Sequence, residues 1–447
     1  MFKLKTTLLW CAVAFTCSSV AAQFSQPGYP QQFAASPYPA APTAENQLVT
    51  FQDSALQHLR NVENYGNRAS RSIENTGISF RGWVTHGYTG SPSEPVNGSN
   101  LPTGFNDQAN KYLMNQLYII AKADLAPQKE DWSASARLDI LYGSDYFFTM
   151  AQGLETNRNG TPHWNSSNGP RINAAGSAAL YGLAMPQFYL DADIPIAGGL
   201  GIKAGHFYSP LSGESVMSAA NFFASHSLGM LFGTPRTHTG LVASKPLDAS
   251  SSFQIGLTRG WDNLTDDNNQ LSLLAGVRQS TEYGHLEFNI HTGDDTATSD
   301  RLTIMTLRLE KEISDKFGYG AEATFGIAEN GLSNVSSGTF KQAKWYGVAH
   351  YFIYDINDKI DAGLRVEWFN DESNSRIMGV PIQDLYEGGQ YVNITLGANI
   401  LATKGFLIRP ELRWDWSNTI VNGVQRPFVD FSKDSQITLS FDIIHEF

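Results

Sequence analysis

The C-terminal segment Ser435–Phe447 (SQITLSFDIIHEF) constrains the fold of this 447-residue chain more than any other stretch. Apolar residues occupy every second position at Ile437, Leu439, Phe441 and Ile443, and polar residues lie between them. Strict alternation of this kind is typical of a β-strand with one apolar and one polar face. A bacterial outer-membrane barrel needs such a strand as its closing wall segment, apolar toward lipid and polar toward the interior. The alternative at this point is a buried strand of a soluble β-sandwich.

Segments with strand character recur from Ile78 to the C-terminus. Alternation is clean in several of them, for example at 284–292, 390–401 and 405–416. An even number of antiparallel strands of about ten residues is expected of an outer-membrane barrel. We predict sixteen strands, at about 78–89, 112–125, 132–144, 186–196, 199–209, 237–246, 251–261, 270–279, 284–292, 301–312, 316–327, 343–354, 359–369, 390–401, 405–416 and 435–447.

The connections between these strands belong to two sets that alternate along the chain. The short set comprises 126–131, 197–198, 246–250, 280–283, 313–315, 355–358 and 402–404. The other set, mostly longer, comprises 90–111, 145–185, 210–236, 262–269, 293–300, 328–342, 370–389 and 417–434. Outer-membrane barrels have short periplasmic turns and longer extracellular loops, whereas a sandwich has no reason to keep its long loops at one end. The predicted fold class is therefore all-β, a transmembrane antiparallel up-and-down barrel, whose closure leaves no unpaired strand edge in lipid.

The N-terminal part of the chain predicts export. Residues 1–22 have a positively charged start, an apolar stretch and small residues at the cleavage position, which indicates a secretory signal peptide rather than the alternative, a membrane anchor. Residues 23–72 are rich in Gln, Pro and Ala and are predicted to form a periplasmic linker, with a short helix at about 49–60. The outer-membrane barrel is expected over residues 73–447.

Composition excludes several classes of protein. The two cysteines, Cys11 and Cys17, lie in the signal peptide, so the mature chain has neither disulfides nor thiolate metal sites. After residue 22 no apolar run approaches the roughly 20 residues of a membrane-spanning helix. A net charge of -12 argues against a nucleic-acid partner, because phosphates require a basic surface. We expect no cofactor.

Short motifs spread over the chain resemble a known family. They are Arg137-Leu138-Asp139, Tyr142–Asp145, Tyr181–Tyr189, Gly205–Tyr208, Asn221–Phe223, Ser225–Ser227, Pro235, Thr237–Gly240 and Arg259–Asp262. As a set they resemble the outer-membrane β-barrel porins called OmpL-like or β-barrel porin-2, over roughly residues 78–447. The resemblance implies a porin of Gram-negative-type bacteria and defines no particular solute.

The predicted outer-membrane barrel also implies partners for the chain. These are the lipid of the outer membrane and small hydrophilic solutes or ions. We further expect the C-terminal strand that ends at Phe447 to engage the barrel-assembly machinery. The oligomeric state is left open, although homo-trimers are common among such porins.

The stretch 205–240 departs most from the repetition of strands. Within it, the connection 210–236 is long enough to fold into the barrel mouth, where a loop narrows the lumen and selects by size and charge. A loop that caps the outer surface or contacts a neighbouring protomer is the alternative, and the connection 145–185 is a competing constriction loop. The candidate constriction residues are His206, Glu214, Phe222, Phe223, His226 and His238.

The polar faces of the predicted strands give a set of side chains that we expect to line the pore. They are Lys122, Asp124, Arg137, Asp139, Asp191, Lys203, Glu287, His291, Glu322, Arg365, Glu367, Arg409, Glu411, Arg413 and Asp442. Acidic residues outnumber basic ones on these faces, and charges on a lumen wall enrich the counter-ion. We therefore predict a weak preference for cations, although pairs such as Arg365 with Glu367 can neutralise each other.

Other functions have weaker support in the sequence. Ser225 and His226 are adjacent, but neighbours on a strand point to opposite faces, and the chain has no G-x-S-x-G elbow. His206, His226 and His238 match no compact metal-ligand pattern, so we expect no metal site. We predict a protein that is not an enzyme. An outer-membrane lipid or peptide hydrolase and a non-conducting structural or adhesive barrel remain the alternatives.

Overall fold

A computed structural model of the chain describes residues 71–73, 76–125, 132–173, 176–265, 268–295, 301–333, 340–377, 386–421 and 425–447. The expected signal peptide, and the expected linker with its short helix up to residue 70, lie outside the described residues.

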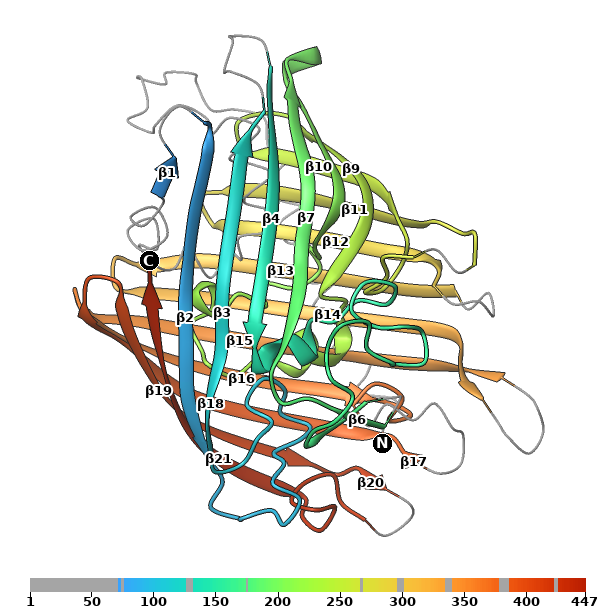
Figure 1. The fold of residues 1–447 in the computed structure, drawn as a ribbon, viewed down its shortest axis with the longest axis vertical. Coiled ribbons are helices and arrows are strands. Elements are labelled where there is room, and N and C mark those ends of the chain that lie inside the picture. Colours follow the sequence, from blue (N-terminus) through green and yellow to red (C-terminus); the bar gives the residue numbers. More distant parts are fainter. Residues whose placement is uncertain are drawn as a thin grey trace, which may run out of the picture. The chain divides into compact units, whose positions relative to one another are not determined.

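A single antiparallel sheet dominates the described part of the chain (Figure 1). Its sixteen long strands are β2 (Ile78–Gly90), β3 (Lys111–Asp124), β4 (Ser133–Gly143), β7 (Gly182–Ile194), β8 (Leu200–Tyr208), β9 (Thr237–Pro246), β10 (Ser251–Thr258), β11 (Ser272–Thr281), β12 (Gly284–Asp294), β13 (Arg301–Ser314), β14 (Phe317–Ser333), β15 (Phe340–Asn357), β16 (Ile360–Asp371), β18 (Gly389–Thr403), β19 (Phe406–Ser417) and β21 (Ser435–Glu446). Each strand pairs with the next in this series, and β21 pairs with β2 from Trp83↔Glu446 to Gly90↔Leu439. This last pairing closes the sheet into a barrel, as predicted, and the sandwich alternative is wrong.

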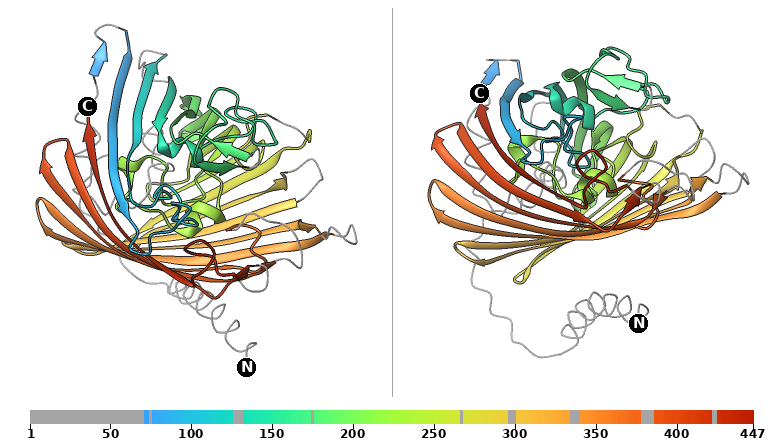
Figure 2. Two further views of the ribbon diagram at one scale, coloured as in Figure 1. Left: turned by 60° about the horizontal axis from the view of Figure 1, so that its bottom comes forward. Right: turned by 90° about the horizontal axis from the view of Figure 1, so that it is seen from below.

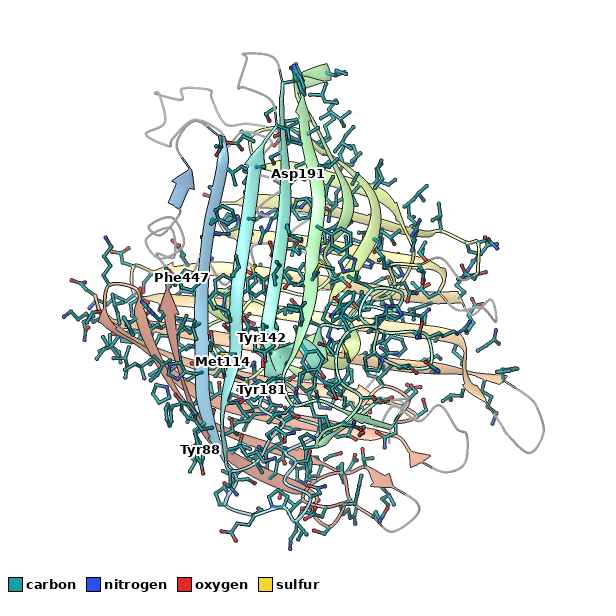
Figure 3. All side chains as sticks on the ribbon, in the orientation of Figure 1. Tyr88, Met114, Tyr142, Tyr181, Asp191 and Phe447 are labelled. Atoms are coloured by element: carbon teal, nitrogen blue, oxygen red, sulfur yellow. The ribbon has the colours of Figure 1, made fainter. Side chains whose placement is uncertain are left out.

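Burial follows the alternation that the sequence predicts. On β21 the apolar Ile437, Leu439 and Phe441 are exposed on the outside of the wall, whereas Gln436 and Asp442 are buried. The labelled Tyr88, Met114 and Tyr142 lie along the neighbouring strands β2, β3 and β4 (Figure 3). One face of the wall is thus suited to lipid, and the polar face is turned to the interior.

Two neighbouring strands are longer than the pattern predicts. β14 and β15 have 17 and 18 residues, so the connection between them begins after Ser333 rather than at residue 328. The pairing of these strands shifts register between Ala328 and Leu332 and then resumes. Such a bulge breaks the period of two, and for this reason the alternation stops at residue 327 although the hairpin continues.

A short strand extends the sheet at the seam of the barrel. β1 (Arg71–Ile73) pairs with β2 at residues 78–80, next to the stretch of β2 that pairs with β21. The backbone N–H and C=O of Gly82 bond those of Phe447 at 3.0 and 2.9 Å. β1 spans the expected boundary between linker and barrel at residues 72 and 73.

The remaining elements lie in the connections. They are the short helices η2 (Ser144–Phe148), η3 (Ile196–Gly198), η4 (Ser218–Ala220) and η5 (Gly229–Gly233), the hairpin of β5 (Arg171–Asn173) with β6 (Gly176–Ala178), and the pair of β17 (Tyr386–Glu387) with β20 (Ile420–Val421). No helix in the described ranges has the length and apolar character needed to cross a membrane.

Candidate functional site

The barrel interior contains the segment 209–236, which connects β8 to β9 and which we call the inner loop. Figure 2 shows this green segment, with its short helices η4 and η5, inside the ring of strands. Its hydrogen bonds reach β2 and β3 on one side and β12, β14, β15, β16 and β19 on the other. Because it contacts walls on both sides, the inner loop crosses the lumen.

Arg409 of β19 holds the first half of the inner loop through backbone carbonyls. One guanidinium nitrogen donates to Ser218 O at 2.9 Å and to Asn221 O at 2.7 Å. Its other nitrogens bond both carboxylate oxygens of Asp442 on β21. A bidentate pair of this kind is strong and fixes the geometry of both partners.

Arg365 and Arg413 also hold the inner loop through backbone carbonyls, at Ser225 and His226, and Arg365 in addition binds Glu214 near the start of the loop. Arg365 donates to Glu214 Oε1 at 2.8 Å, to Ser225 O at 2.9 Å and to Ser225 Oγ at 3.0 Å. Arg413 donates to His226 O at 2.7 Å and pairs with Asp415 at the same distance. Both arginine side chains are fully buried.

Carboxylates of the wall accept backbone N–H groups of the inner loop. Glu367 accepts from Leu228 and Gly229 at 2.8 Å each, and Glu411 accepts from Ser225 at 3.1 Å. Buried backbone groups need partners, and ionised partners give bonds about twice as strong as neutral ones. The charges on this side of the interior therefore replace water around the backbone of the inner loop.

Two aromatic side chains of the inner loop fit against glycines of the wall. A Cβ atom at Gly363 of β16 would lie 2.4 Å from the Phe222 ring, and one at Gly397 of β18 would lie 3.0 Å from the Phe223 ring. Phe222 and Phe223 pack edge to face with ring centroids 4.9 Å apart. The absence of a side chain at these two wall positions makes room for the rings.

Burial and charge shift the pKa values of two groups in the inner loop. Burial raises the pKa of Glu214, but the Arg365 guanidinium and the Ser227 N–H lower it by more, so the net pKa lies below the usual value. Burial lowers the pKa of His226 to about 4, and the Glu214 carboxylate only partly opposes this. At neutral pH the inner loop therefore carries an ionised Glu214 beside a neutral His226.

The contacts of the inner loop with β2 and β3 are of a different kind. Thr85 Oγ1 and Ser218 Oγ lie 2.5 Å apart. The Gln116 side chain donates to Val216 O at 2.7 Å and accepts from Ser218 N at 3.1 Å. These groups are all neutral, and a neutral hydrogen bond contributes about 1 kcal/mol. The inner loop is thus held more weakly on this side.

A narrow cavity lies between the inner loop and the wall of β2, β3 and β21. Its free volume of about 20 Å³ holds about one or two water molecules. The first long loop, 91–110, covers it: the Phe105 ring stacks on His226 with centroids 4.2 Å apart and on Phe148 at 5.0 Å. The polar lining includes Thr85, Thr89, Asn115, Asp145, Ser218 and Asp442.

The side chains expected to line the pore fall into three groups. Asp124 is exposed, and Lys122, Arg137 and Asp191 are partly exposed. Most of the others are buried beneath the inner loop or in ion pairs, so they do not border open water in this structure. This buried group contains Asp139, Lys203, Glu287, His291, Glu322, Arg365, Glu367, Arg409, Glu411, Arg413 and Asp442.

The candidate constriction residues divide between the inner loop and the wall. Glu214, Phe222, Phe223 and His226 lie in the inner loop, whereas His206 and His238 lie on β8 and β9. His206 Nδ1 is 2.8 Å from Thr239 Oγ1, and His238 Nε2 is 3.0 Å from Ser209 Oγ. These two histidines are part of the wall and not of a loop that crosses the lumen, because the strands continue through both positions.

Sequence reasoning missed the residues that face the inner loop across the cavity. Asn115, Gln116 and Asp145 were not among the expected lining, and the first long loop was not expected to enter the mouth. The pairing of β2 with β3 shifts register between Thr85 and His86. Beyond this shift, counting alternate residues no longer identifies which side chains of the two strands face the interior. One available signal was the position of Asp145, directly after a predicted strand.

The geometry gives Ser225 and His226 separate partners. The Ser225 hydroxyl accepts a bond from Arg365, while His226 Nε2 lies 3.0 Å from Ser215 O. This arrangement does not form a nucleophile with its base. In the described part of the chain, no group of three or more His, Cys, Asp or Glu side chains is placed to hold a metal ion.

Comparisons with known proteins agree with the barrel. A family model described as beta-barrel porin-2, OmpL-like matches residues 77–447. No curated protein matches the chain.

Several solved structures are similar to the barrel. The outer membrane channel DcaP of Acinetobacter baumannii has a TM-score of 0.51 and 10% identity, over 86% of this chain and 99% of that chain. The anion-selective porin from Comamonas acidovorans has a TM-score of 0.55 and 9% identity, over 83% and 100%. OmpF of Salmonella typhi, in complex with daunomycin, has a TM-score of 0.52 and 10% identity, over 85% and 100%. At such low identity the likeness shows the fold alone.

Proposed function

We propose that this chain, which belongs to the beta-barrel porin-2, OmpL-like family, lets small hydrophilic solutes and ions diffuse passively across the outer membrane. Family and fold make it an outer-membrane porin-like channel.

The observation that carries the proposal is the unequal attachment of the inner loop. Buried arginines and carboxylates fix it to β14, β16 and β19, and neutral groups alone join it to β2 and β3 among the contacts described. The weaker side is also the side with the polar cavity. We infer that solutes pass between the inner loop and the β2–β3 wall when this neutral contact opens.

A weak cation preference is the second part of the proposal. The three wall arginines that hold the inner loop each pair with a carboxylate. Further carboxyl groups of the wall, those of Glu322, Glu367 and Glu411, accept N–H or O–H groups of the inner loop. At this contact, carboxyl groups therefore outnumber guanidinium groups. A lumen lined by ionised carboxyl groups enriches cations and repels anions.

Planar-bilayer recording tests the proposal. The refolded chain without residues 1–22 is added to a lipid bilayer under a KCl gradient, and folding is verified beforehand by the different gel mobilities of heated and unheated samples. We expect discrete steps of open-channel current and a reversal potential whose sign shows that potassium is more permeant than chloride. A reversal potential of the opposite sign would remove the cation preference, and folded barrels that never conduct would remove the pore.

One observation favours a second candidate, a structural barrel that does not conduct. The cavity beside the inner loop has a free volume of only about 20 Å³, far below the volume of a hydrated ion or sugar. If the neutral contacts never open, the inner loop closes the lumen. The same recording separates the two functions.

A further inference from the structure

The cavity beside the inner loop contains a buried carboxylate that has no ion-pair partner among the described residues. Asp145, the second residue of η2, is 3% exposed. Its Oδ1 accepts from the Asn115 amide at 3.1 Å and its Oδ2 accepts from the Gln116 amide at 2.9 Å. Among the described residues, no lysine or arginine forms an ion pair with it; the nearby Arg171 instead pairs with Asp107 at 2.6 Å.

The other charged groups of the cavity are compensated or lie in a wetter place. Asp442 is neutralised by Arg409 in a bidentate pair. His226 is neutral at pH 7, because burial lowers its pKa to about 4. Lys111 stands at the first residue of β3, is partly exposed, and donates to Gln108 at 2.9 Å. Water screens a charge at such a position more than one in a buried site.

We propose that Asp145 is the residue that sets the cation preference of the passage between the inner loop and the β2–β3 wall. The inference rests on the proposed pore function and names a determinant of its selectivity. Asp145 is among the residues that line the cavity, so a cation that enters the cavity comes close to its carboxylate. The amides of Asn115 and Gln116 hold that carboxylate in place and leave its charge intact.

The ionisation of Asp145 makes the selectivity depend on pH. Burial raises the pKa of this carboxyl to about 7, against the lowering effect of the two amides and of Arg171. Below pH 7 the group is mostly neutral, and above pH 7 it is mostly charged. Cation preference should therefore increase as the pH rises through about 7.

The experiment measures reversal potentials of the wild-type chain under a KCl gradient at pH 5.5 and pH 8.5, together with those of Asp145→Asn and Asp145→Glu. We expect the wild-type ratio of potassium to chloride permeability to rise ~twofold or more between the two pH values, as expected for a nearby unit charge. Asp145→Asn should remove this rise and show the lower ratio at both pH values. Asp145→Glu should retain the rise. Asp248→Asn, in an exposed short turn between β9 and β10, is the matched control and should behave as the wild type.

The possible outcomes separate the two proposals. If the wild type conducts and prefers cations, but Asp145→Asn retains the same ratio and the same pH dependence, Asp145 is not the determinant. If folded wild-type barrels do not conduct, the pore function itself fails. A wild-type ratio that stays the same at pH 5.5 and pH 8.5 would also overturn the proposal, even if Asp145→Asn does not fold. The comparison with Asp145→Asn also separates this group from Glu155, whose pKa burial likewise raises to about 7 but whose carboxylate accepts from Ala151 and Met185.

Discussion

At the scale of single residues, the buried arginines have a role that their place in the sequence does not reveal. Arg365 on β16 and Arg409 and Arg413 on β19 occupy the alternate, polar positions expected of pore-lining residues. In the structure they donate to carbonyls of the inner loop and are at most 2% exposed. Alternation identifies which face of a strand a side chain is on, but not what covers that face.

The pair of Arg409 and Asp442 gives a test at this scale. We expect Arg409→Met to destabilise the refolded barrel by roughly 3–5 kcal/mol, because it leaves a buried carboxylate without its partner. The double variant Arg409→Met/Asp442→Leu should recover most of that loss, since it removes both charges together. Urea unfolding followed by tryptophan fluorescence measures both. Equal stabilities of the single variant and the wild type would mean that the guanidinium does not hold the inner loop.

Glycines are a second feature that the sequence could not interpret. The chain has 40 of them, and nothing in the local pattern distinguishes Gly363 or Gly397 from the rest. Their function depends on Phe222 and Phe223, which are far away in the chain and meet them only in the folded state. Contacts of this kind are outside the reach of local periodicity.

At the scale of elements, the strands were predictable and the contents of the barrel were only partly so. Fifteen of the sixteen strands lie within about four residues of their predicted ranges, because lipid on one side and polar groups on the other enforce a period of two. The exception, β14, continues past its predicted end to Ser333 because of the bulge. The segment 210–236 was singled out since it departs from that pattern. The entry of the first long loop, 91–110, could not be predicted, because its place depends on the stacking of Phe105 on His226.

The inner loop should loosen in acid. His226 has a pKa of about 4 in the folded protein against 6.5 for a free histidine, because burial disfavours its charged form. Its contribution to stability is therefore complete above pH 6.5 and is lost as the pH falls toward 4, by on the order of 3 kcal/mol. Glu214, whose net pKa is also lowered, acts in the same direction.

Urea midpoints measured between pH 7 and pH 4 test this expectation. Asp145 and Glu155, whose pKa values burial raises to about 7, act in the opposite direction over this interval. The difference between the two proteins isolates His226: relative to His226→Gln, which cannot be protonated, the wild type should lose on the order of 3 kcal/mol between pH 7 and pH 4. Identical pH profiles for the two proteins would show that His226 does not titrate in the folded inner loop.

At the scale of the whole molecule, the barrel interior has two unlike sides. The side of β14, β16 and β19 binds the inner loop through guanidinium and carboxyl groups, and the side of β2 and β3 binds it through hydroxyl and amide groups. The alternation in the sequence predicts that charged side chains face the interior. It does not predict that those on β14, β16 and β19 bind the inner loop. That arrangement depends on which distant strands the closed barrel brings together.

This asymmetry predicts where a covalent link should block transport. Thr85 Oγ1 of β2 and Ser218 Oγ of the inner loop are 2.5 Å apart, so cysteines at these positions should form a disulfide without moving the backbone far. The chain lacks other cysteines beyond the expected signal peptide, so the variant Thr85→Cys/Ser218→Cys has a clean background. If solutes pass between the inner loop and the β2–β3 wall, the oxidised variant should lose most of its conductance and regain it on reduction. The single variants Thr85→Cys and Ser218→Cys serve as controls and should not respond to reductant. A disulfide at this contact would keep the inner loop attached to β2, on the side where only neutral groups hold it. Full conductance in the oxidised state, with the disulfide verified by mass spectrometry, would therefore place the passage elsewhere in the barrel.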